Sequence, residues 1–327
     1  MKKIIVDTLL SDLGEEEVVK GAILASFNHP EIQFKLVGNK ANIEKILNDN
    51  NQDLDLYEIV DAKPCDTLSP NPIEYLNGHD DISMLKALNL LSKDEEAIGL
   101  LSSGPTGLLL VGSMFKLGLI RNVKFPSLAA LLININQRKV CIVDCGANLD
   151  VKPTRLVQFA KQGCALISSY YGNISPRVGL LNVGKEEGKG NATLKETFEL
   201  LSQSNLNFKG NIEGSDAFLD KVDVVVCDGY VGNVLLKNSE AVAMICKAIN
   251  EKSGSEEKAI KEANETIYNM FGYNELGGAI VLGTNKLVMK AHGACNKKSI
   301  ASIVDDLVKL DENNLISKMK ETLGEEK

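Results

Sequence analysis

The chain of 327 residues has no tryptophan, and aromatic residues make up only 5% of it. Nucleic-acid binding commonly relies on aromatic side chains that stack on bases, and no such binding motif is recognisable, so we expect no nucleic acid partner. No apolar run approaches the roughly 20 residues that span a bilayer. The first residues, MKKIIVDTLLSDLGEEE, turn acidic soon after the initial lysines, which predicts a strand and a turn instead of a signal peptide.

Residues that bind metals or form disulfides are also scarce. The three histidines, His29, His79 and His292, lie far apart and lack partners at ligand spacing, so we expect no metal site. The seven cysteines are an odd number without a CxxC pair. Most of them lie in apolar segments, as small core residues do in a reducing cytoplasm, and we therefore predict a cytoplasmic protein.

Charge is distributed unevenly along the sequence. The formal net charge is −8, yet residues 116–195 contain twelve lysines and arginines against four acids. A basic middle in an acidic chain predicts an anionic ligand or an acidic partner at that place. Solvated helix faces are the alternative explanation.

Short apolar, β-branched runs alternate with segments of helical period through most of the chain. This alternation predicts a three-layer α/β/α fold with a mostly parallel sheet and helices on both faces. We expect a single α/β domain over residues 1–327, with a short, polar helical arm near 251–269. The predicted strands are Lys3–Asp7, Ile32–Gly38, Leu56–Asp61, Ala97–Ser102, Leu128–Asn134, Val140–Cys145, Val178–Val183, Leu206–Lys209, Val222–Asp228 and Lys286–His292.

Three predicted strands end in the same kind of polar segment. In DCGANLDVKP (144–153), an apolar run stops at glycine, Asn148 and Lys152 before a helix begins. Segments 177–191 and 222–233 repeat this design and end in Asn191 and Asn233. Parallel strands that end in this way border a crevice in which a ligand binds, so we predict one shared site. For any one of these turns, the backbone demands of a strand-to-helix connection are an alternative explanation.

Two glycine-rich loops are candidate anion sites. Ser102–Gly107 (SSGPTG) follows an apolar strand, and Gly104 and Gly107 allow backbone N–H groups to approach a phosphate, although the loop is not a Walker A motif. In Gly184–Asn191 (GKEEGKGN), Lys189 lies between two glycines and suits a phosphate or a developing oxyanion. A plain βα turn and a solvated loop are the respective alternatives. His292 ends a further predicted strand, and a structural histidine is as compatible with that pattern as a catalytic one.

Taken together, these segments resemble the bacterial acyl-ACP:phosphate acyltransferase (PlsX) family. The resemblance covers most of the chain from Lys139 onward. It implies a Rossmann-like fold related to phosphotransacetylases and to isocitrate and isopropylmalate dehydrogenases, usually as a homodimer. The matching segments are DCGANLDVKPTRLVQFA, NISPRVGLLNVGKEEGKGN, LNFKGNIEGSD, VDVVVCDGYVGNVLLK and LGGAIVLGTNKLVMKAHGACN.

The N-terminal half departs from the family pattern. The family's DAMGGD turn is here Asp7-TLLS-Asp12, which keeps both acids and loses the glycines. Its KKDSSM segment is here HDDISM (79–84), and Pro105 replaces an asparagine of its SAGNTGAL loop. The family's apolar, basic helical insert is replaced by the polar region 251–269, so we expect weak or no membrane contact.

The resemblance implies transfer of a fatty acyl group from acyl-[acyl carrier protein] to inorganic phosphate, giving acyl phosphate for phospholipid synthesis without a redox or metal cofactor. The alternatives are a catalytically weakened homologue that binds the carrier protein, and a short-chain acyl-CoA phosphate acyltransferase. The predicted catalytic residues are Lys189, His292, Asp228 and Asn233. The predicted substrate-binding residues are Gly104, Thr106, Gly107, Asn148, Lys152, Asn191 and Asn296.

Overall fold

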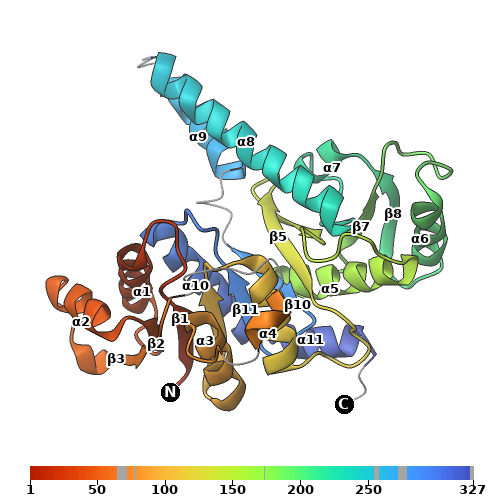
Figure 1. Cartoon of the computed structure of the whole chain (residues 1–327). Helices are drawn as coiled ribbons and strands as arrows, with labels where there is room; N and C mark the ends of the chain where they lie inside the picture. Colours follow the sequence, from red (N-terminus) through yellow and green to blue (C-terminus); the bar gives the residue numbers. More distant parts are fainter. Residues whose placement is uncertain (65–71, 77–78, 173, 254–257, 272–277, 325–327) are drawn as a thin grey trace. The chain divides into compact units, whose positions relative to one another are not determined.

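The computed structural model of the chain describes residues 1–64, 72–76, 79–172, 174–253, 258–271 and 278–324 (Figure 1). Its contacts divide the chain into two compact units. Unit 1 consists of residues 1–126 and 277–312, and unit 2 of residues 127–276 and 313–327. The prediction of a single domain stays a prediction.

Unit 1 is built on a sheet of strand order β3–β2–β1–β4–β11–β10, in which β10 alone pairs antiparallel, among the described residues. Its strands are β1 (Lys3–Asp7), β2 (Gln33–Gly38), β3 (Tyr57–Asp61), β4 (Ala97–Ser102), β10 (Ala279–Leu282) and β11 (Leu287–Lys290). Its helices are α1 (Glu15–Asn28), α2 (Lys40–Asp49), α3 (Ser83–Lys93), α4 (Thr106–Leu117), α10 (Lys297–Glu312) and the 3₁₀ turns η1 (Leu54–Leu56) and η2 (Pro72–Leu76).

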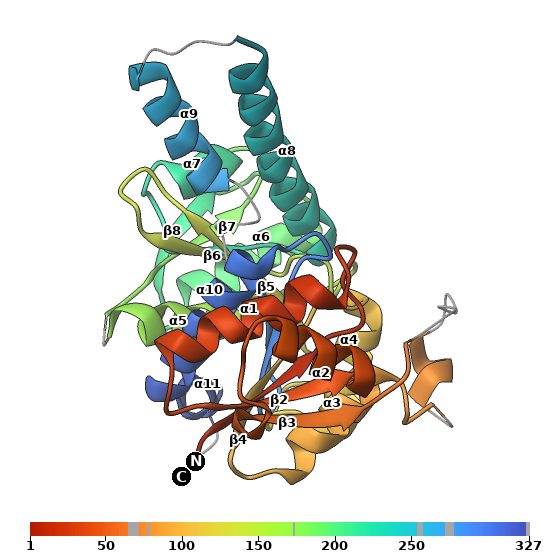
Figure 2. The ribbon, with the colours of Figure 1, turned by 90° about the vertical axis from the view of Figure 1, so that its left-hand side faces the viewer.

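The helices of unit 1 cover both faces of its sheet. From β1 through α1 the chain moves to β2, whereas from β3 through α3 it moves back to β4, so right-handed crossovers place α1 and α3 on opposite faces. Helix α1 lies beside α10 (Figure 2). A Cβ atom on Gly21 of α1 would lie 2.4 Å from the Cβ atom of Ile300 of α10. The absence of a side chain at Gly21 therefore sets how closely these two helices pack.

Unit 2 has the strand order β5–β6–β9–β7–β8, with β5 antiparallel to β6 and the others parallel. Its strands are β5 (Ser127–Ile133), β6 (Lys139–Val143), β7 (Arg177–Leu181), β8 (Asn207–Ile212) and β9 (Val224–Val226). Its helices are α5 (Pro153–Tyr171), α6 (Ala192–Ser202), α7 (Gly214–Phe218), α8 (Gly229–Ser253), α9 (Lys258–Phe271) and α11 (Leu315–Thr322).

Strands β5, β6, β7 and β9 of unit 2 are short, largely buried apolar runs, as expected for strands between helices, whereas the edge strand β8 is polar and partly exposed. Val140, Ile142 and Val225 are fully buried, and they share one core cluster with Leu181 and Ile212. The mostly parallel α/β fold with flanking helices that the sequence predicts is thus confirmed within each unit. No helix among the described residues is long and apolar enough to cross a membrane.

One strand was absent from the sequence-based expectation. The short strand β10 was not predicted, because its apolar run AIVL is bounded closely by Gly278 and Gly283. The polar region near 251–269 is where we expect a short helical arm, and this stays a prediction. It comprises the end of α8 and most of α9, and these two helices lie side by side as a hairpin (Figures 1 and 2).

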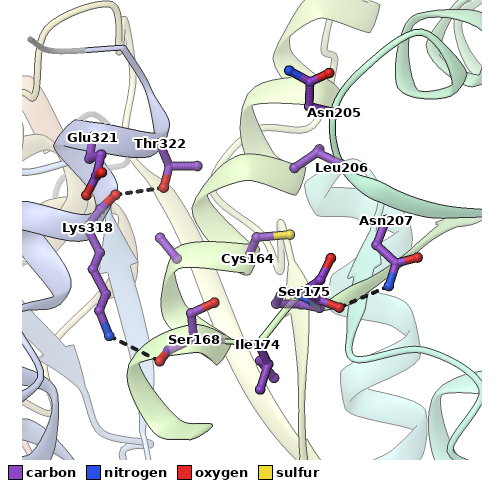
Figure 3. Close-up of a pocket in the computed structure, with 12 residues that line it drawn as sticks. Cys164, Ser168, Ile174, Ser175, Asn205, Leu206, Asn207, Lys318, Glu321 and Thr322 are labelled. Atoms are coloured by element: carbon purple, nitrogen blue, oxygen red, sulfur yellow. Dashed lines mark hydrogen bonds between the residues drawn. The ribbon is translucent and has the colours of Figure 1, made fainter. Parts of the chain in front are cut away.

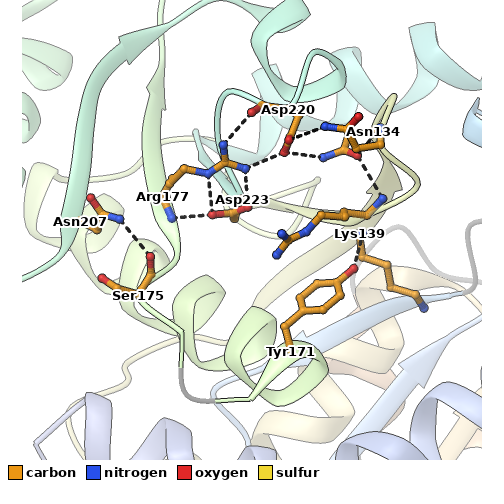
Figure 4. Close-up of polar contacts among 10 residues, drawn as sticks. Asn134, Lys139, Tyr171, Ser175, Arg177, Asn207, Asp220 and Asp223 are labelled. Carbon is orange, nitrogen blue, oxygen red and sulfur yellow. Dashed lines mark hydrogen bonds and ion pairs between the residues drawn. The ribbon is translucent and has the colours of Figure 1, made fainter.

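A partly buried ion-pair network fixes the amino-terminal edge of the unit 2 sheet (Figure 4). The Arg177 guanidinium donates through Nε and Nη2 to the two carboxylate oxygens of Asp223 at 2.9 and 2.8 Å. Its Nη2 also donates to Asp220 Oδ1 at 2.6 Å. Asn134 and Asn136, from the turn between β5 and β6, donate to the same Asp220 carboxylate. One arginine therefore links the start of β7, the start of β9 and the β5–β6 turn.

Arg177→Met should destabilise the protein by about 3 kcal/mol, because it leaves the buried Asp223 carboxylate without its countercharge. Urea unfolding measures this change. The matched control is Arg138→Met, which removes an exposed arginine stacked 4.8 Å from the centroid of the Tyr171 ring. It should cost about 1 kcal/mol or less. Equal losses in the two variants would contradict the central role of Arg177.

The pH dependence of folding stability provides a second test of the same variant. Hydrogen bonding to Arg177 lowers the pKa of Asp220. Burial by itself would raise the pKa of Asp223, but the hydrogen bonds from Arg177 and the nearby positive charges together lower it. Both groups therefore stabilise the fold above their unfolded pKa of about 3.9, and this contribution is lost as the pH falls through the folded pKa values. The decrease in the free energy of unfolding on going from neutral to acidic pH should be smaller in Arg177→Met than in the wild-type protein.

Candidate active site

The polar segment after β6 is organised around the buried carboxylate of Asp144. Its Oδ1 accepts the backbone N–H groups of Leu128 and Ala147, both at 3.1 Å. Its Oδ2 accepts the backbone N–H of Asn148 at 2.8 Å and the Asn148 side-chain amide at 2.6 Å. Burial raises the pKa of Asp144, and these hydrogen bonds oppose that effect only in part. The Asn148 amide is thereby held in a single orientation.

The start of α8 packs directly against this segment. The Gly229 N–H donates to the Asn148 carbonyl oxygen at 2.7 Å. A Cβ atom on Gly232 would lie 1.9 Å from the Asp144 carbonyl oxygen, so only glycine permits this approach. Gly146, with a φ of 120°, places its backbone near Asn233, whose Cβ lies 3.7 Å from the Cβ position of that glycine. The structure therefore brings the Asn148 and Asn233 segments together, as the shared-site prediction requires.

Asp228 has a structural role at the same helix end. Its Oδ1 accepts the N–H of Val231 at 2.9 Å, which caps the first turn of α8. Asp228 is half-buried, and Asn233 is exposed one turn further along the helix. Both residues thus lie at the carboxyl end of β9, where the sequence places them. Their catalytic roles stay predictions.

The glycine–lysine loop after β7 is anchored at both ends. The Asn182 amide donates to the Lys189 carbonyl oxygen at 3.2 Å and to Asn211 Oδ1 at 3.1 Å. Asn211 in turn donates to the Glu186 carbonyl oxygen at 2.8 Å. Asn191 caps α6 by accepting the Leu194 N–H at 2.9 Å. The loop is therefore a positioned element in which several backbone groups are already paired.

The two lysines of this loop differ in their environments, which the sequence could not reveal. Lys185 forms an ion pair with the buried Asp216 at 2.8 Å. Among the described residues, Glu186 is the one acid within 4.0 Å of the Lys189 ammonium, with its Oε1 at 3.9 Å, and the Lys189 side chain is half exposed. Because a hydrogen bond requires a closer approach, the Lys189 ammonium is available to an anion. Lys152 is likewise exposed, at the N-terminal cap of α5.

In unit 1, the SSGPTG loop follows β4 and is held by the buried acid of β1. The Ser102 hydroxyl donates to Asp7 Oδ2 at 2.6 Å and accepts the Gly104 N–H at 3.1 Å. Burial raises the pKa of Asp7. A Cβ atom on Gly104 would lie 2.2 Å from the Met84 terminal methyl group, so the loop backbone passes closely over α3. Thr106 and Gly107 begin α4, with Gly107 exposed.

The segment after β11 lies beside this loop, because β11 pairs in parallel with β4. The Lys290 ammonium donates to the carbonyl oxygens of Ser103, at 3.2 Å, and of Ala291. His292 Nδ1 accepts the Ala294 N–H at 3.2 Å, and Asn296 caps α10 through the Ser299 N–H at 3.1 Å. Unit 1 thus brings its five predicted site residues to the ends of two paired strands.

Sequence reasoning missed the residues that support these loops. Lys290, Asp7, Asn182 and Asn211 hold the loops through hydrogen bonds to distant segments. The one available signal was their position, since each lies at or near the end of a strand. In the part of the chain that the structure describes, no group of three or more histidine, cysteine and acidic residues could hold a metal ion.

A polar cavity of about 360 Å³ lies at the opposite, amino-terminal edge of the unit 2 strands (Figure 3). Lys318 donates to the Ser168 carbonyl oxygen at 3.1 Å on one side, and Asn207 donates to the Ser175 carbonyl oxygen at 3.0 Å on the other. Burial raises the pKa of the Cys164 thiol to about 12, so this thiol stays protonated at neutral pH. None of the predicted site residues lines this cavity.

Comparison with solved structures defines the class of fold. A phosphotransacetylase from Streptococcus pyogenes matches with a TM-score of 0.66 at 14% identity, over 96% of this chain and 94% of that chain. A putative 4-hydroxythreonine-4-phosphate dehydrogenase from Salmonella typhimurium matches with a TM-score of 0.55 at 12% identity, over 95% and 99%. At such identities the likeness shows the fold alone. It is the α/β fold of phosphotransacetylases and related dehydrogenases.

Sequence comparison is more specific. A family model described as "Fatty acid synthesis protein" matches residues 2–318. The phosphate acyltransferase of Clostridium acetobutylicum is 35% identical over 329 residues, covering 98% of this chain and 99% of that protein. The chain therefore belongs to the phosphate acyltransferase family, as its motifs had indicated, and it is an enzyme of this class.

The Asp144 carboxylate should be indispensable for this arrangement. In Asp144→Asn, one oxygen becomes an amide nitrogen that faces N–H donors, so the variant should lose about 3 kcal/mol of stability. Thermal and urea unfolding measure this loss. The matched control is the same substitution at the exposed Asp150, which should change stability by no more than about 0.5 kcal/mol. A stable Asp144→Asn variant would show that the loop does not depend on the carboxylate.

Proposed function

We propose that the protein transfers a fatty acyl group from acyl-[acyl carrier protein] to inorganic phosphate, and that the acyl phosphate formed serves phospholipid synthesis in the cytoplasm. The observation that carries this proposal is the available ammonium of Lys189. It lies in a glycine loop anchored at the carboxyl edge of the unit 2 sheet, beside the strand ends that present Asn148 and Asn233. Membership of the phosphate acyltransferase family supports the same reaction.

In the proposed reaction, a phosphate oxygen attacks the thioester carbonyl carbon, and the carbonyl oxygen becomes an oxyanion. The C–S bond then breaks, the acyl phosphate forms, and the carrier thiolate leaves and takes up a proton. The Lys189 ammonium offsets the negative charge of the phosphate, and the Asn148 and Asn233 amides are suited to donate to the oxyanion. For unit 1, the roles of Gly104, Thr106 and Gly107 in phosphate binding and of His292 or a lysine as proton donor stay predictions.

Lys189→Ala should lower the rate of acyl phosphate formation by about tenfold to a few hundredfold, which is the effect of losing one charge-assisted hydrogen bond. Thermal stability should hardly change, because the side chain is half exposed. Lys195→Ala, which removes an exposed lysine from the neighbouring helix α6, is the control and should keep the wild-type rate. A folded Lys189→Ala enzyme with unchanged kinetics would place phosphate binding elsewhere.

Two other functions remain candidates. Pro105 in the SSGPTG loop and the acids at 80 and 81 motivate a weakened homologue that binds the carrier without turnover. Asp80 and Asp81 are paired with Lys116 and Lys63, both at 2.8 Å. A short-chain acyl-CoA phosphate acyltransferase is the other candidate. One thiol-release assay with acyl-carrier and acyl-CoA donors separates the three functions. Phosphate-dependent release from the carrier donor indicates the proposed acyltransferase, and release from acyl-CoA alone indicates the short-chain enzyme. No phosphate-dependent release from either donor indicates the weakened homologue.

We also propose that the carrier protein docks on basic residues of unit 2 and that the enzyme is a homodimer. Lys152 is exposed and Lys161 half-exposed on α5, whereas Arg155 donates to Gln158 at 3.0 Å within the same helix. Acyl carrier proteins are acidic, so the two lysines are suited to contact them. The apolar side chains of Met244, Ile245 and Ile249 on α8, each more than half exposed, support the dimer.

The double variant Lys152→Ala/Lys161→Ala should bind the acyl carrier protein more weakly, and the salt dependence of binding should flatten because two charges are removed. Titration of the carrier at several salt concentrations measures both effects. The control is Lys195→Ala/Lys209→Ala, which removes the same charge from exposed positions elsewhere in unit 2. Equal weakening in both double variants would indicate general electrostatic attraction instead of a docking surface.

A further inference from the structure

An apolar cleft of about 340 Å³ opens at the carboxyl edge of the unit 2 sheet. Its volume lies at the lower end of the range of small-molecule sites. The end of β7, the start of α6 and the first turns of α8 form its walls. Its apolar lining residues are Leu181, Val183, Leu194, Val231, Val234 and Leu235.

The α8 wall of this cleft has helical spacing. Val234, Leu235 and Asn238 follow Val231 by three, four and seven residues, so the four side chains share one face of the helix. Val234 is 53% exposed, and Val183 on the opposite wall is 82% exposed. Apolar side chains that stay this exposed beside a candidate active site indicate a surface for an apolar ligand.

The lining also excludes most other ligands. None of the described residues that line the cleft is charged, and the polar ones are Asn182 and Asn238. A phosphate or an acidic protein surface would find no countercharge there, so neither fits the cleft. An uncharged hydrocarbon chain matches this lining.

The cleft is continuous with the glycine–lysine loop. Asn182, which lines the cleft, also donates to the carbonyl oxygen of Lys189. A Cβ atom on Gly190 would lie 2.8 Å from Asn182 Oδ1 and 2.9 Å from the Leu194 Cβ, so the loop backbone lies directly against the cleft wall. A chain bound in the cleft would therefore begin beside the residue proposed to hold phosphate.

We propose that this cleft binds the hydrocarbon chain of the acyl donor and sets the chain lengths that the enzyme accepts, an inference that rests on the proposed acyltransferase function. The thioester end of the donor lies toward Lys189, and the methylene groups pack between α8 and α6. Burial of methylene groups then contributes to binding in proportion to chain length, up to the length of the cleft.

The test narrows the cleft with Val234→Phe. Acyl phosphate formation is measured with hexadecanoyl and butyryl thioesters of one carrier. The ratio of kcat/KM for the long donor to that for the short one should fall by about tenfold or more, because the ring occupies the space of the distal methylene groups. The matched control is Val242→Phe, the same substitution at a part-exposed position of α8 outside the cleft, and it should leave the ratio unchanged.

The outcomes separate the cleft from the function. If the wild-type enzyme forms acyl phosphate and Val234→Phe leaves the ratio unchanged, the cleft is not the acyl site, although the proposed function stands. If the wild-type enzyme forms no acyl phosphate with any donor, the proposed function fails. Binding of the fluorescent fatty acid dansyl-undecanoic acid then tests by itself whether the cleft binds an apolar chain. Binding that Val234→Phe abolishes and Val242→Phe preserves supports an apolar-chain site. Absence of binding, or equal binding by both variants, overturns it.

Discussion

The buried carboxylate of Asp144 is the interaction on which the site of unit 2 depends. A carboxylate in an apolar core is costly unless donors surround it, and here four N–H bonds from β5, the loop and Asn148 do so. The same bonds fix the loop backbone against which α8 begins. Since α8 carries Asn233 and one wall of the apolar cleft, one buried charge positions the polar and the apolar parts of the site.

The two edges of the unit 2 sheet have different tasks. At the amino-terminal edge, Arg177 forms ion pairs with Asp220 and Asp223, so its charge stabilises the fold. At the carboxyl edge, the Lys189 ammonium stays available to an anion. A parallel sheet favours this division, because all its strands end at one edge, where loops of different origin can meet around a ligand.

Glycines shape the site because they allow neighbouring segments to approach closely, and not only because they make loops flexible. Gly232 admits the Asp144 carbonyl oxygen, and Gly190 admits the Asn182 amide. Any side chain at either position would push a helix or a loop away from its neighbour. The sequence pattern of glycine next to asparagine predicts where these loops lie, but it gives no partner for either glycine.

The sequence by itself determined the parallel α/β class, the strand ends that carry the polar segments and the family, because hydrophobic period and motif order are local properties. It did not separate Lys185 from Lys189, since the difference is an ion pair to Asp216, 31 residues further along the chain. Nor did it show that Asn191 and Asn296 cap helices, or that a valine after β7 and two valines of α8 line one cleft. Only the tertiary structure decided these points, because contacts between distant segments settle which polar groups are satisfied and which apolar groups stay exposed.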